Sequence, residues 1–293
     1  MNIYTSLNDD FALESPSAVC LGKFDGIHLG HRKLFSKVLE SNLTPVVFTF
    51  TVPSEPSSFK YIYTQEEKIS LLEGLKISTL YTVPFDINLM CIKPYDFIKK
   101  ILIKKLNAKL IVVGQDFRFG NNREGDVEFL MKYAPTFGYE VIALDKLKKD
   151  TIVSSTRIRT LLQYGKIEEA NELLGSDFFF KGRVVHGKEL GRTIGFPTAN
   201  LKINPNKIDL KNGVYAGTTF VNNREYKSIS NYGIRPTVDG KTPNLETYIY
   251  DFNEDIYDAE IIVKLQKFVR PEMKFSSVEE LKNQIERDKN SYK

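Results

Sequence analysis

Cysteine is scarce in this chain of 293 residues, and long apolar runs are missing from it. The two cysteines, Cys20 and Cys91, cannot build a disulfide scaffold. Both lie beside apolar residues, so we expect two reduced thiols in the core. No stretch of about 18 apolar residues is present, which excludes a transmembrane helix. The first residues have no basic start and no apolar segment, so we expect no signal peptide and a cytoplasmic protein.

A large excess of one charge is also missing. Lys and Arg number 41 against 37 Asp and Glu, a net charge of +4. Because nucleic-acid binders usually carry a stronger and clustered basic excess, this balance fits small anionic ligands at least as well. Hydrophobic residues (42%) and charged residues (27%) are near globular averages, which excludes collagen-like, disordered and coiled-coil proteins.

The first half of the chain alternates strand-like and helix-like segments. Apolar runs predict strands over residues 18–22, 45–50, 79–83, 110–114 and 139–144. Helical spacing predicts helices over 31–41, 64–74, 94–106 and 126–134. Thr64, with Glu67 three residues later, predicts a capping box. We therefore expect a doubly wound α/β domain with a parallel sheet and a ligand at the C-terminal ends of its strands.

The second half is rich in strand signals and turns. Strands are predicted over 178–186, 214–221, 225–232, 245–250 and 260–268, and an amphipathic helix over 276–289. This pattern indicates a small antiparallel β-barrel or sandwich closed by a C-terminal helix. Two short helical patterns within 154–175 form a connector, so we expect domains at 1–177 and 178–293.

Two of the three histidines stand in a glycine-rich segment that follows a strand and opens a helix, GKFDGIHLGH. Free N–H groups and the helix dipole make such a turn an anion site, and glycines let the backbone approach a phosphate. His28 and His31 can reach one phosphate and stabilise the charge that builds on it. Zinc binding is an alternative reading, but further ligands at suitable spacing are missing. A capped tight turn is the purely structural alternative.

A second glycine-rich loop begins after His186 and has the pattern of a phosphate cover, with Gly187, Lys188, Gly191, Arg192 and Gly195. It runs into FPTAN, where the Thr198 hydroxyl and the Asn200 carbonyl are hard oxygen donors suited to Mg²⁺ shared with ATP.

These strings resemble a known family. GKFDGIHLGH, VGQDFRFGNNREGD and SSTRIR resemble the FMN adenylyltransferase module of bacterial bifunctional FAD synthetases, which belongs to the nucleotidyltransferase superfamily. GRVVHGKELGRTIGFPTANL, NGVYAG, NYGIRPT and LETYIYDF resemble their riboflavin kinase module. The resemblance implies that the C-terminal module makes FMN from riboflavin and ATP. It implies that the N-terminal module makes FAD and pyrophosphate from FMN and ATP.

The resemblance also implies roles for single residues. His28 and His31 would bind and stabilise the ATP phosphates during adenylyl transfer, in a nucleotide site formed with Gly22, Phe24, Asp25, Gly30, Ser155, Thr156 and Arg157. Flavin contacts would lie at Asp116, Phe117 and Arg118. In the kinase module, Thr198 and Asn200 would hold Mg²⁺ and Glu246 would be the general base.

One departure and two alternatives stay open. After the second strand the chain reads FTFTVP (48–53), where family members often carry a Phe-x-Pro-His-Pro-like segment, so the efficiency of adenylylation is in doubt. A different nucleotidyltransferase with an RNA-recognition barrel would leave the FPTAN string unexplained. A flavin-binding regulator without turnover would consume no ATP. The expected partners are riboflavin, FMN, FAD, ATP, ADP and pyrophosphate, with neither nucleic acid nor membrane; the oligomeric state is left open.

Overall fold

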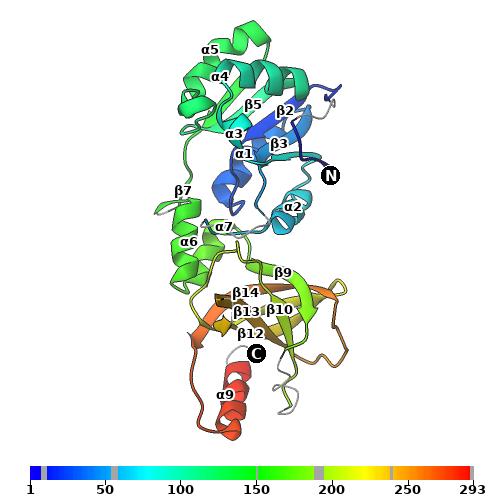
Figure 1. The fold of residues 1–293 in the computed structure, drawn as a ribbon, viewed down its shortest axis with the longest axis vertical. Coiled ribbons are helices and arrows are strands. Elements are labelled where there is room, and N and C mark those ends of the chain that lie inside the picture. Colours follow the sequence, from blue (N-terminus) through cyan, green and yellow to red (C-terminus); the bar gives the residue numbers. More distant parts are fainter. Residues whose placement is uncertain (8–11, 54–58, 150, 188–194, 238–239, 291–293) are drawn as a thin grey trace. The chain divides into compact units, whose positions relative to one another are not determined.

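The computed structural model divides by its contacts into two compact units (Figure 1). The first comprises Met1–Glu55 and Tyr63–Ser154, and the second comprises Pro56–Ile62 and Ser155–Lys293. The structure describes residues 1–7, 12–53, 59–149, 151–187, 195–237 and 240–290. Within these ranges, no helix has the length and apolar character needed to cross a membrane.

A six-stranded parallel sheet forms the centre of the first unit, in the order β1-β4-β3-β2-β5-β6. Its strands are β1 (Asn2–Tyr4), β2 (Ser17–Leu21), β3 (Thr44–Phe50), β4 (Thr79–Val83), β5 (Ala108–Gly114) and β6 (Glu140–Leu144). The helices are α1 (Leu29–Leu39), α2 (Gln65–Gly74), α3 (Ile87–Met90), α4 (Pro94–Asp96), the π-helix η1 (Phe97–Lys105), the 3₁₀ turn η2 (Asn121–Arg123) and α5 (Val127–Phe137). A two-stranded ribbon follows, β7 (Lys148–Lys149) and β8 (Thr151–Ile152). The predicted doubly wound α/β fold is confirmed.

The sheet has a separate core on each face, because alternate side chains of a strand point to opposite sides. From β2, Val19 and Leu21 join the core that contains η1 and α5 residues, whereas Ala18 and Cys20 join the core that contains α1 and α2 residues. β2 lies between β3 and β5, so the strand order reverses at β2. In open parallel sheets, ligands bind at such a switch point, beyond the C-terminal ends of the strands. The fold therefore singles out the turn after β2.

The structure reproduces the predicted strands and longer helices of this unit, but the short elements α3, η2, β7 and β8 were not predicted. The capping box of α2 is confirmed, since the Thr64 hydroxyl accepts from Glu67 N and the Glu67 carboxylate accepts from Thr64 N. β1 was not predicted; it is an edge strand held by parallel pairing with β4. Cys20 is buried, but Cys91 is exposed, so the prediction of a core thiol there is wrong. Its apolar neighbour Met90 is itself 46% exposed on the short helix α3.

A closed six-stranded antiparallel barrel forms the second unit, in the order β10-β13-β12-β11-β14-β9. Its strands are β9 (Phe178–Val185), β10 (Thr198–Lys202), β11 (Gly213–Val221), β12 (Arg224–Thr237), β13 (Gly240–Ile249) and β14 (Glu260–Pro271). The helices are α6 (Ser155–Gln163), α7 (Ile167–Leu174) and the C-terminal α9 (Val278–Asn290). β9 pairs with both β14 and β10, which closes the barrel and excludes the sandwich alternative.

The helix α7 is bonded to the barrel through one side chain. Asn171 Nδ2 donates to Leu265 O at 2.8 Å, and Asn171 Oδ1 accepts from Phe178 N at 2.8 Å. By contacts, α6 and α7 group with the barrel. The expected boundary between 177 and 178 concerns catalytic modules and stays a prediction.

Replacement of Asn171 by Ala should lower the free energy of unfolding of the barrel unit by about 1–3 kcal/mol, because it leaves two partly buried backbone groups without their partner. A urea titration of the full chain, monitored by hydrogen exchange of the barrel amides, measures this effect. Glu169→Ala on the same helix removes only a surface pair with Lys166 and should cost less than about 0.5 kcal/mol. Equal effects of the two substitutions would contradict the role given to Asn171.

Candidate functional sites

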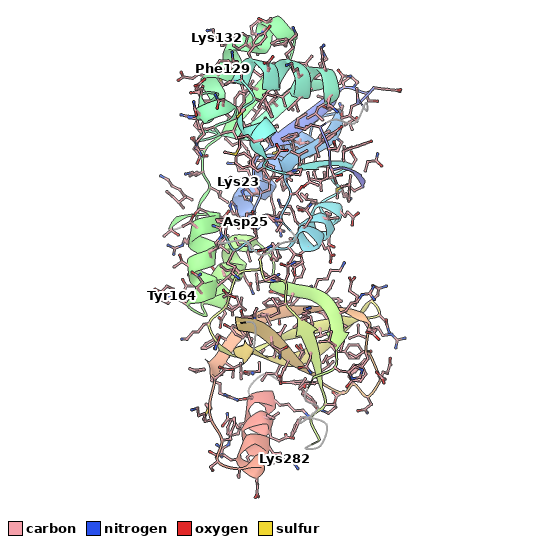
Figure 2. All side chains as sticks on the ribbon, viewed as in Figure 1. Lys23, Asp25, Phe129, Lys132, Tyr164 and Lys282 are labelled. Carbon is pink, nitrogen blue, oxygen red and sulfur yellow. The ribbon has the colours of Figure 1, made fainter. Side chains whose placement is uncertain are left out.

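The turn from Gly22 to His28 connects β2 to α1 at the switch point and has an unusual backbone. Phe24 and Ile27 have φ values of +47° and +41°, in the left-handed region that residues other than glycine rarely adopt. At Gly22, an added Cβ would lie 2.8 Å from the Phe24 ring, so any other residue would displace this buried ring. Asp25, labelled with Lys23 in Figure 2, is 7% exposed. Such conformations persist only where the surroundings hold them, and they concentrate at functional sites.

Two stacked imidazoles begin α1. The ring centroids of His28 and His31 are 3.6 Å apart with 17° between the ring planes. His28 is the N-cap residue, and its Nδ1 accepts a hydrogen bond from His31 N at 3.3 Å. Because Nδ1 is the acceptor, the proton of the neutral ring lies on Nε2, which is left as a donor. An added Cβ on Gly30 would lie 3.2 Å from the His28 ring, so the glycine makes room for it.

Both imidazoles are neutral at pH 7. Burial lowers the pKa of His28 to about 4, against a smaller opposing effect of its backbone hydrogen bond. The pKa of His31 is well below its ordinary value because of burial and then the charges of His28 and Lys68. Within the described ranges, no group hydrogen-bonds to the buried His31 Nδ1. A helix N-terminus lined by neutral imidazoles suits an anion, which would meet donors and the positive end of the dipole.

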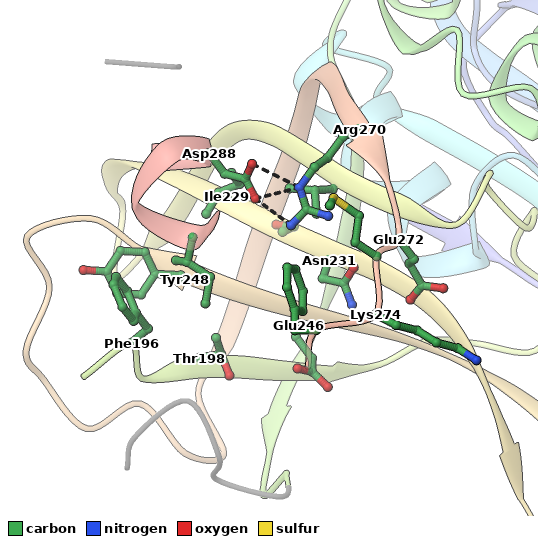
Figure 3. A pocket seen from close by; sticks show the side chains of 15 residues that line it. Phe196, Thr198, Ile229, Asn231, Glu246, Tyr248, Arg270, Glu272, Lys274 and Asp288 are labelled. Carbon is green, nitrogen blue, oxygen red and sulfur yellow. Dashed lines mark hydrogen bonds and ion pairs between the residues drawn. The ribbon is translucent and has the colours of Figure 1, made fainter. Parts of the chain in front are cut away.

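A cavity of about 540 Å³ lies on the outer wall of the barrel, next to α9 (Figure 3). This volume is within the range of small-molecule sites. On β13, Glu246 and Tyr248 line the cavity, whereas Leu245 and Thr247 between them are completely buried on the inner face. Alternate residues of β13 therefore face the cavity and the core of the barrel.

Polar side chains form a row across three strands of this wall. In the strand register, Asn200 on β10 and Asn231 on β12 both lie directly opposite Glu246 on β13. Residues directly opposite one another in neighbouring strands project from the same face. Thr198, two residues before Asn200, shares that face and lines the cavity. Asn244 Nδ2 donates to Glu246 Oε1 at 3.0 Å.

One ion pair fixes the helical side of the cavity. Arg270 Nε and Nη2 donate to Asp288 Oδ2 at 2.9 and 2.7 Å, and the two side chains are only 16% and 5% exposed (Figure 3). This fork joins the end of β14 to α9. Neither residue was a candidate from the sequence, since a pair 18 residues apart leaves no local pattern.

The comparisons agree with this division of the chain. Sequence models of two families match it, FAD synthetase over residues 11–157 and riboflavin kinase over residues 174–293. The bifunctional riboflavin kinase/FMN adenylyltransferase of Bacillus subtilis (strain 168) is 37% identical over 291 residues, which cover 94% of this chain and 91% of the relative. That of Escherichia coli (strain K12) is 36% identical over 293 residues, covering 94% and 92%. This chain belongs to the bifunctional riboflavin kinase/FMN adenylyltransferase family.

The fold extends the relationship over nearly the whole chain. A Streptococcus pneumoniae crystal structure, described as a macrolide-efflux protein, matches with a TM-score of 0.89 and 33% identity, covering 99% of this chain and 98% of that one. Within the family, the glycine turn belongs to the FAD synthetase part and the barrel cavity to the riboflavin kinase part.

The predicted flavin contacts follow β5, the neighbour of β2 at the switch point. The Asp116 carboxylate is 2.9 Å from Lys146 Nζ, and Arg118 Nη2 is 3.9 Å from the Asp126 carboxylate. Phe117 stacks on Phe119 with centroids 5.6 Å apart. Phe119 is 7% exposed and belongs to the core of the first unit.

The remaining predicted phosphate contacts belong to the second unit. Ser155, Thr156 and Arg157 begin α6, and their position relative to the histidine pair stays a prediction. A Cβ on Gly187 would lie 2.4 Å from Asn200 Nδ2, so that amide packs directly on the glycine. Gly195 has a φ of +87°. The other predicted residues of this loop lie outside the described residues: Lys188, Gly191 and Arg192.

The neutral histidine pair predicts a pH effect on the first unit. Unfolded His28 binds a proton below about pH 6.5, whereas folded His28 does so only below about pH 4. The unfolded chain therefore binds more protons between these values, and the free energy of unfolding falls by about 2–3 kcal/mol as the pH drops from 7 to 4. Hydrogen exchange of β2 and α1 amides, corrected for intrinsic rates, measures this loss.

His28→Asn supplies the control for this pH effect, because it keeps a side-chain acceptor at the N-cap and removes the titrating group. The variant should show a flatter pH dependence in the first unit and an unchanged one in the barrel. The same slope in the variant and the wild type would contradict the assignment.

Proposed function

We propose that adenylyl transfer takes place at the glycine turn, with His28 and His31 holding the phosphates of ATP. An FMN phosphate oxygen attacks the α-phosphorus of ATP, a new P–O–P bond forms, and pyrophosphate leaves with the electrons of the broken bond. Charge builds on the non-bridging oxygens, and neutral imidazole N–H groups stabilise it. The stacked, neutral pair at the start of α1 is the observation that carries this proposal. Gly22, Phe24, Asp25 and Gly30 would shape the site around these phosphates.

Two further segments complete the adenylyltransferase proposal. Ser155, Thr156 and Arg157 supply two hydroxyls and a guanidinium, which can hold an oxyanion through charge-assisted hydrogen bonds. Asp116, Phe117 and Arg118 would contact the flavin nucleotide. Their place after β5 supports this, because β5 adjoins β2 where the strand order reverses.

The barrel cavity is our proposed site for riboflavin phosphorylation, with Glu246 as the general base. The Glu246 carboxylate takes the proton of the ribityl hydroxyl while its oxygen attacks the γ-phosphorus of ATP and ADP leaves. Phosphoryl transfer needs mainly positioning and charge neutralisation, with a base for the hydroxyl proton. Support comes from the position of Glu246 in the cavity wall, in the row that includes Asn200. The aromatic rings of Phe196 and Tyr248, 5.4 Å apart, offer an apolar surface for a flavin ring.

The donor set at this wall fits Mg²⁺ brought with ATP. Within the described ranges, no group of three or more His, Cys, Asp or Glu residues could hold a metal ion by itself. The Thr198 hydroxyl and the Asn200 carbonyl are hard oxygen donors, and Asn200 Nδ2 is turned to Thr198 O at 3.3 Å. The bound ion would neutralise phosphate charge. The loop from Gly187 to Gly195 would cover the phosphates.

Both reactions consume ATP, and we place them in the cytoplasm, where ATP is available. The histidine pair and the barrel cavity lie in different units, which supports two catalytic modules, and we propose the bounds 1–177 and 178–293 for them. FMN made by the second is a substrate of the first. Incubation with riboflavin and Mg-ATP, followed by chromatography, should show FMN and then FAD; an absence of both products would overturn the proposal.

The double substitution His28→Ala, His31→Ala should lower FAD formation at least about 10²-fold, because it removes donors that act on the transition state. Riboflavin phosphorylation should stay within two-fold, since both histidines lie in the other unit. Paired rates with riboflavin and with FMN measure the difference. Undiminished FAD formation would show that the pair has no phosphate role.

Glu246→Gln should lower FMN formation by about 10²–10⁴-fold, because it keeps the shape of the side chain and removes the base. ATP binding and the adenylylation of supplied FMN should remain. Glu260→Gln on β14 is the matched control, since Glu260 is an exposed residue that pairs with Lys181. A kinase rate within a few-fold of wild type for Glu246→Gln would rule out the general-base role.

A further inference from the structure

A buried lysine stands beside the histidine pair and was not a candidate from the sequence. Lys68, on α2, is only 3% exposed. Its Nζ donates three hydrogen bonds: to Lys23 O at 3.1 Å, to Thr49 Oγ1 at 3.2 Å and to Phe50 O at 3.1 Å. An ammonium group has three donors, so all of them are used. Lysine is almost never fully buried, and here its direct acceptors are neutral oxygens.

These bonds join three separate segments at the C-terminal edge of the sheet. Lys23 belongs to the glycine turn after β2, Thr49 and Phe50 end β3, and Lys68 belongs to α2. The Thr49 hydroxyl also donates to Lys23 O, at 2.9 Å. The turn itself contains the two positive φ values described above, and such a backbone needs contacts from outside to hold it. Lys68 supplies such contacts from a different helix.

The charge of Lys68 acts on the same site. Burial lowers its pKa to about 8, and the carboxylate of Asp25 on the turn opposes this shift. The side chain is therefore cationic at pH 7, and its charge is one reason for the low pKa of His31. Among the described residues, Asp25 on the turn and His31 on α1 interact with it electrostatically, and Glu67, its neighbour in the chain, is bonded in the capping box. From β3, Thr49 and Phe50 face it with neutral oxygens.

We propose that Lys68 is a positioning residue for adenylyl transfer, whose ammonium group fixes the glycine turn against β3 and helps to keep His31 neutral for the nucleotide. The inference rests on the proposed role of this turn in binding ATP. The phosphates would meet donors whose geometry is set in advance, with a fixed positive charge behind them. Lys68 acts through the turn and through His31, since its own three donors are occupied.

Lys68→Met tests the proposal in the full chain, with Lys68→Arg as the conservative variant. Lys68→Met should lower kcat/KM for FAD formation by about 10–100-fold, the size expected from a small misplacement of reacting groups. Riboflavin phosphorylation in the same preparation should stay within two-fold. Lys37→Met is the matched control: Lys37 is a surface residue of α1, paired with Glu40, and its removal should change neither rate.

Two readouts separate this role from simple stabilisation of the fold. For the wild type, kcat/KM for FAD formation should fall above about pH 8, where Lys68 loses its proton. Lys68→Arg should shift this alkaline limb of the pH profile to higher pH. Lys68→Met should show no such limb. The imidazole NMR signals of His31 should report a higher pKa in Lys68→Met, because a repelling charge is gone. A stabilising role alone would move neither the limb nor the pKa.

Each result of these measurements supports or overturns the proposed role of Lys68. A wild-type rate in Lys68→Met, or an unchanged alkaline limb in Lys68→Arg, overturns the inference. If Lys68→Met unfolds the first unit, the pH profile of Lys68→Arg alone decides. Full FAD formation in the double histidine variant overturns the proposed phosphate site instead, and a loss in Lys68→Met would then place Lys68 in a different site.

Discussion

The parallel pairing of β2 with β3 on one side and β5 on the other is the constraint on which the first unit depends. It reverses the strand order, and in open parallel sheets ligands bind at the C-terminal edge beside such a reversal. The chain leaves β2 at that point and must turn within a few residues into α1. The left-handed backbone of Phe24 and Ile27 follows from this turn, as does the placement of both histidines at the helix start.

Antiparallel register has the same organising role in the barrel. It sets Asn200, Glu246 and Asn231 side by side on the outer face, while Leu245 and Thr247 fill the interior. A small barrel has no room inside for a ligand once side chains fill it. The cavity is therefore built outside, between the wall and α9, and the Arg270–Asp288 fork holds that helix. The shape of this cavity therefore depends on a contact between β14 and α9.

Electrostatics at the turn follows from burial. Removal from water disfavours the charged form of both imidazoles, so the histidine pair stays neutral, and the ammonium group of Lys68 disfavours the charged form of His31 further. The Lys68 ammonium group donates all its hydrogen bonds to neutral protein oxygens. It therefore acts on an anionic ligand through its charge and not through a direct hydrogen bond. The combination favours an anionic ligand by fixed dipoles and a fixed charge, with little rearrangement on binding.

The sequence by itself determined the alternation of strands and helices, the capping box at Thr64 and the motifs that carry His28, His31, Thr198 and Glu246, because each of these depends on residues close together in the chain. Only the tertiary structure decided the pairing of β1, the closure of the barrel, the exposure of Cys91 and the burial of Lys68. These features depend on contacts between distant segments. Lys68 resembles any helical lysine until α2 packs against β3, and Arg270 and Asp288 become a pair only when α9 folds back onto the barrel. Local periodicity contains no information about such contacts, since the partner of each residue is chosen by the fold.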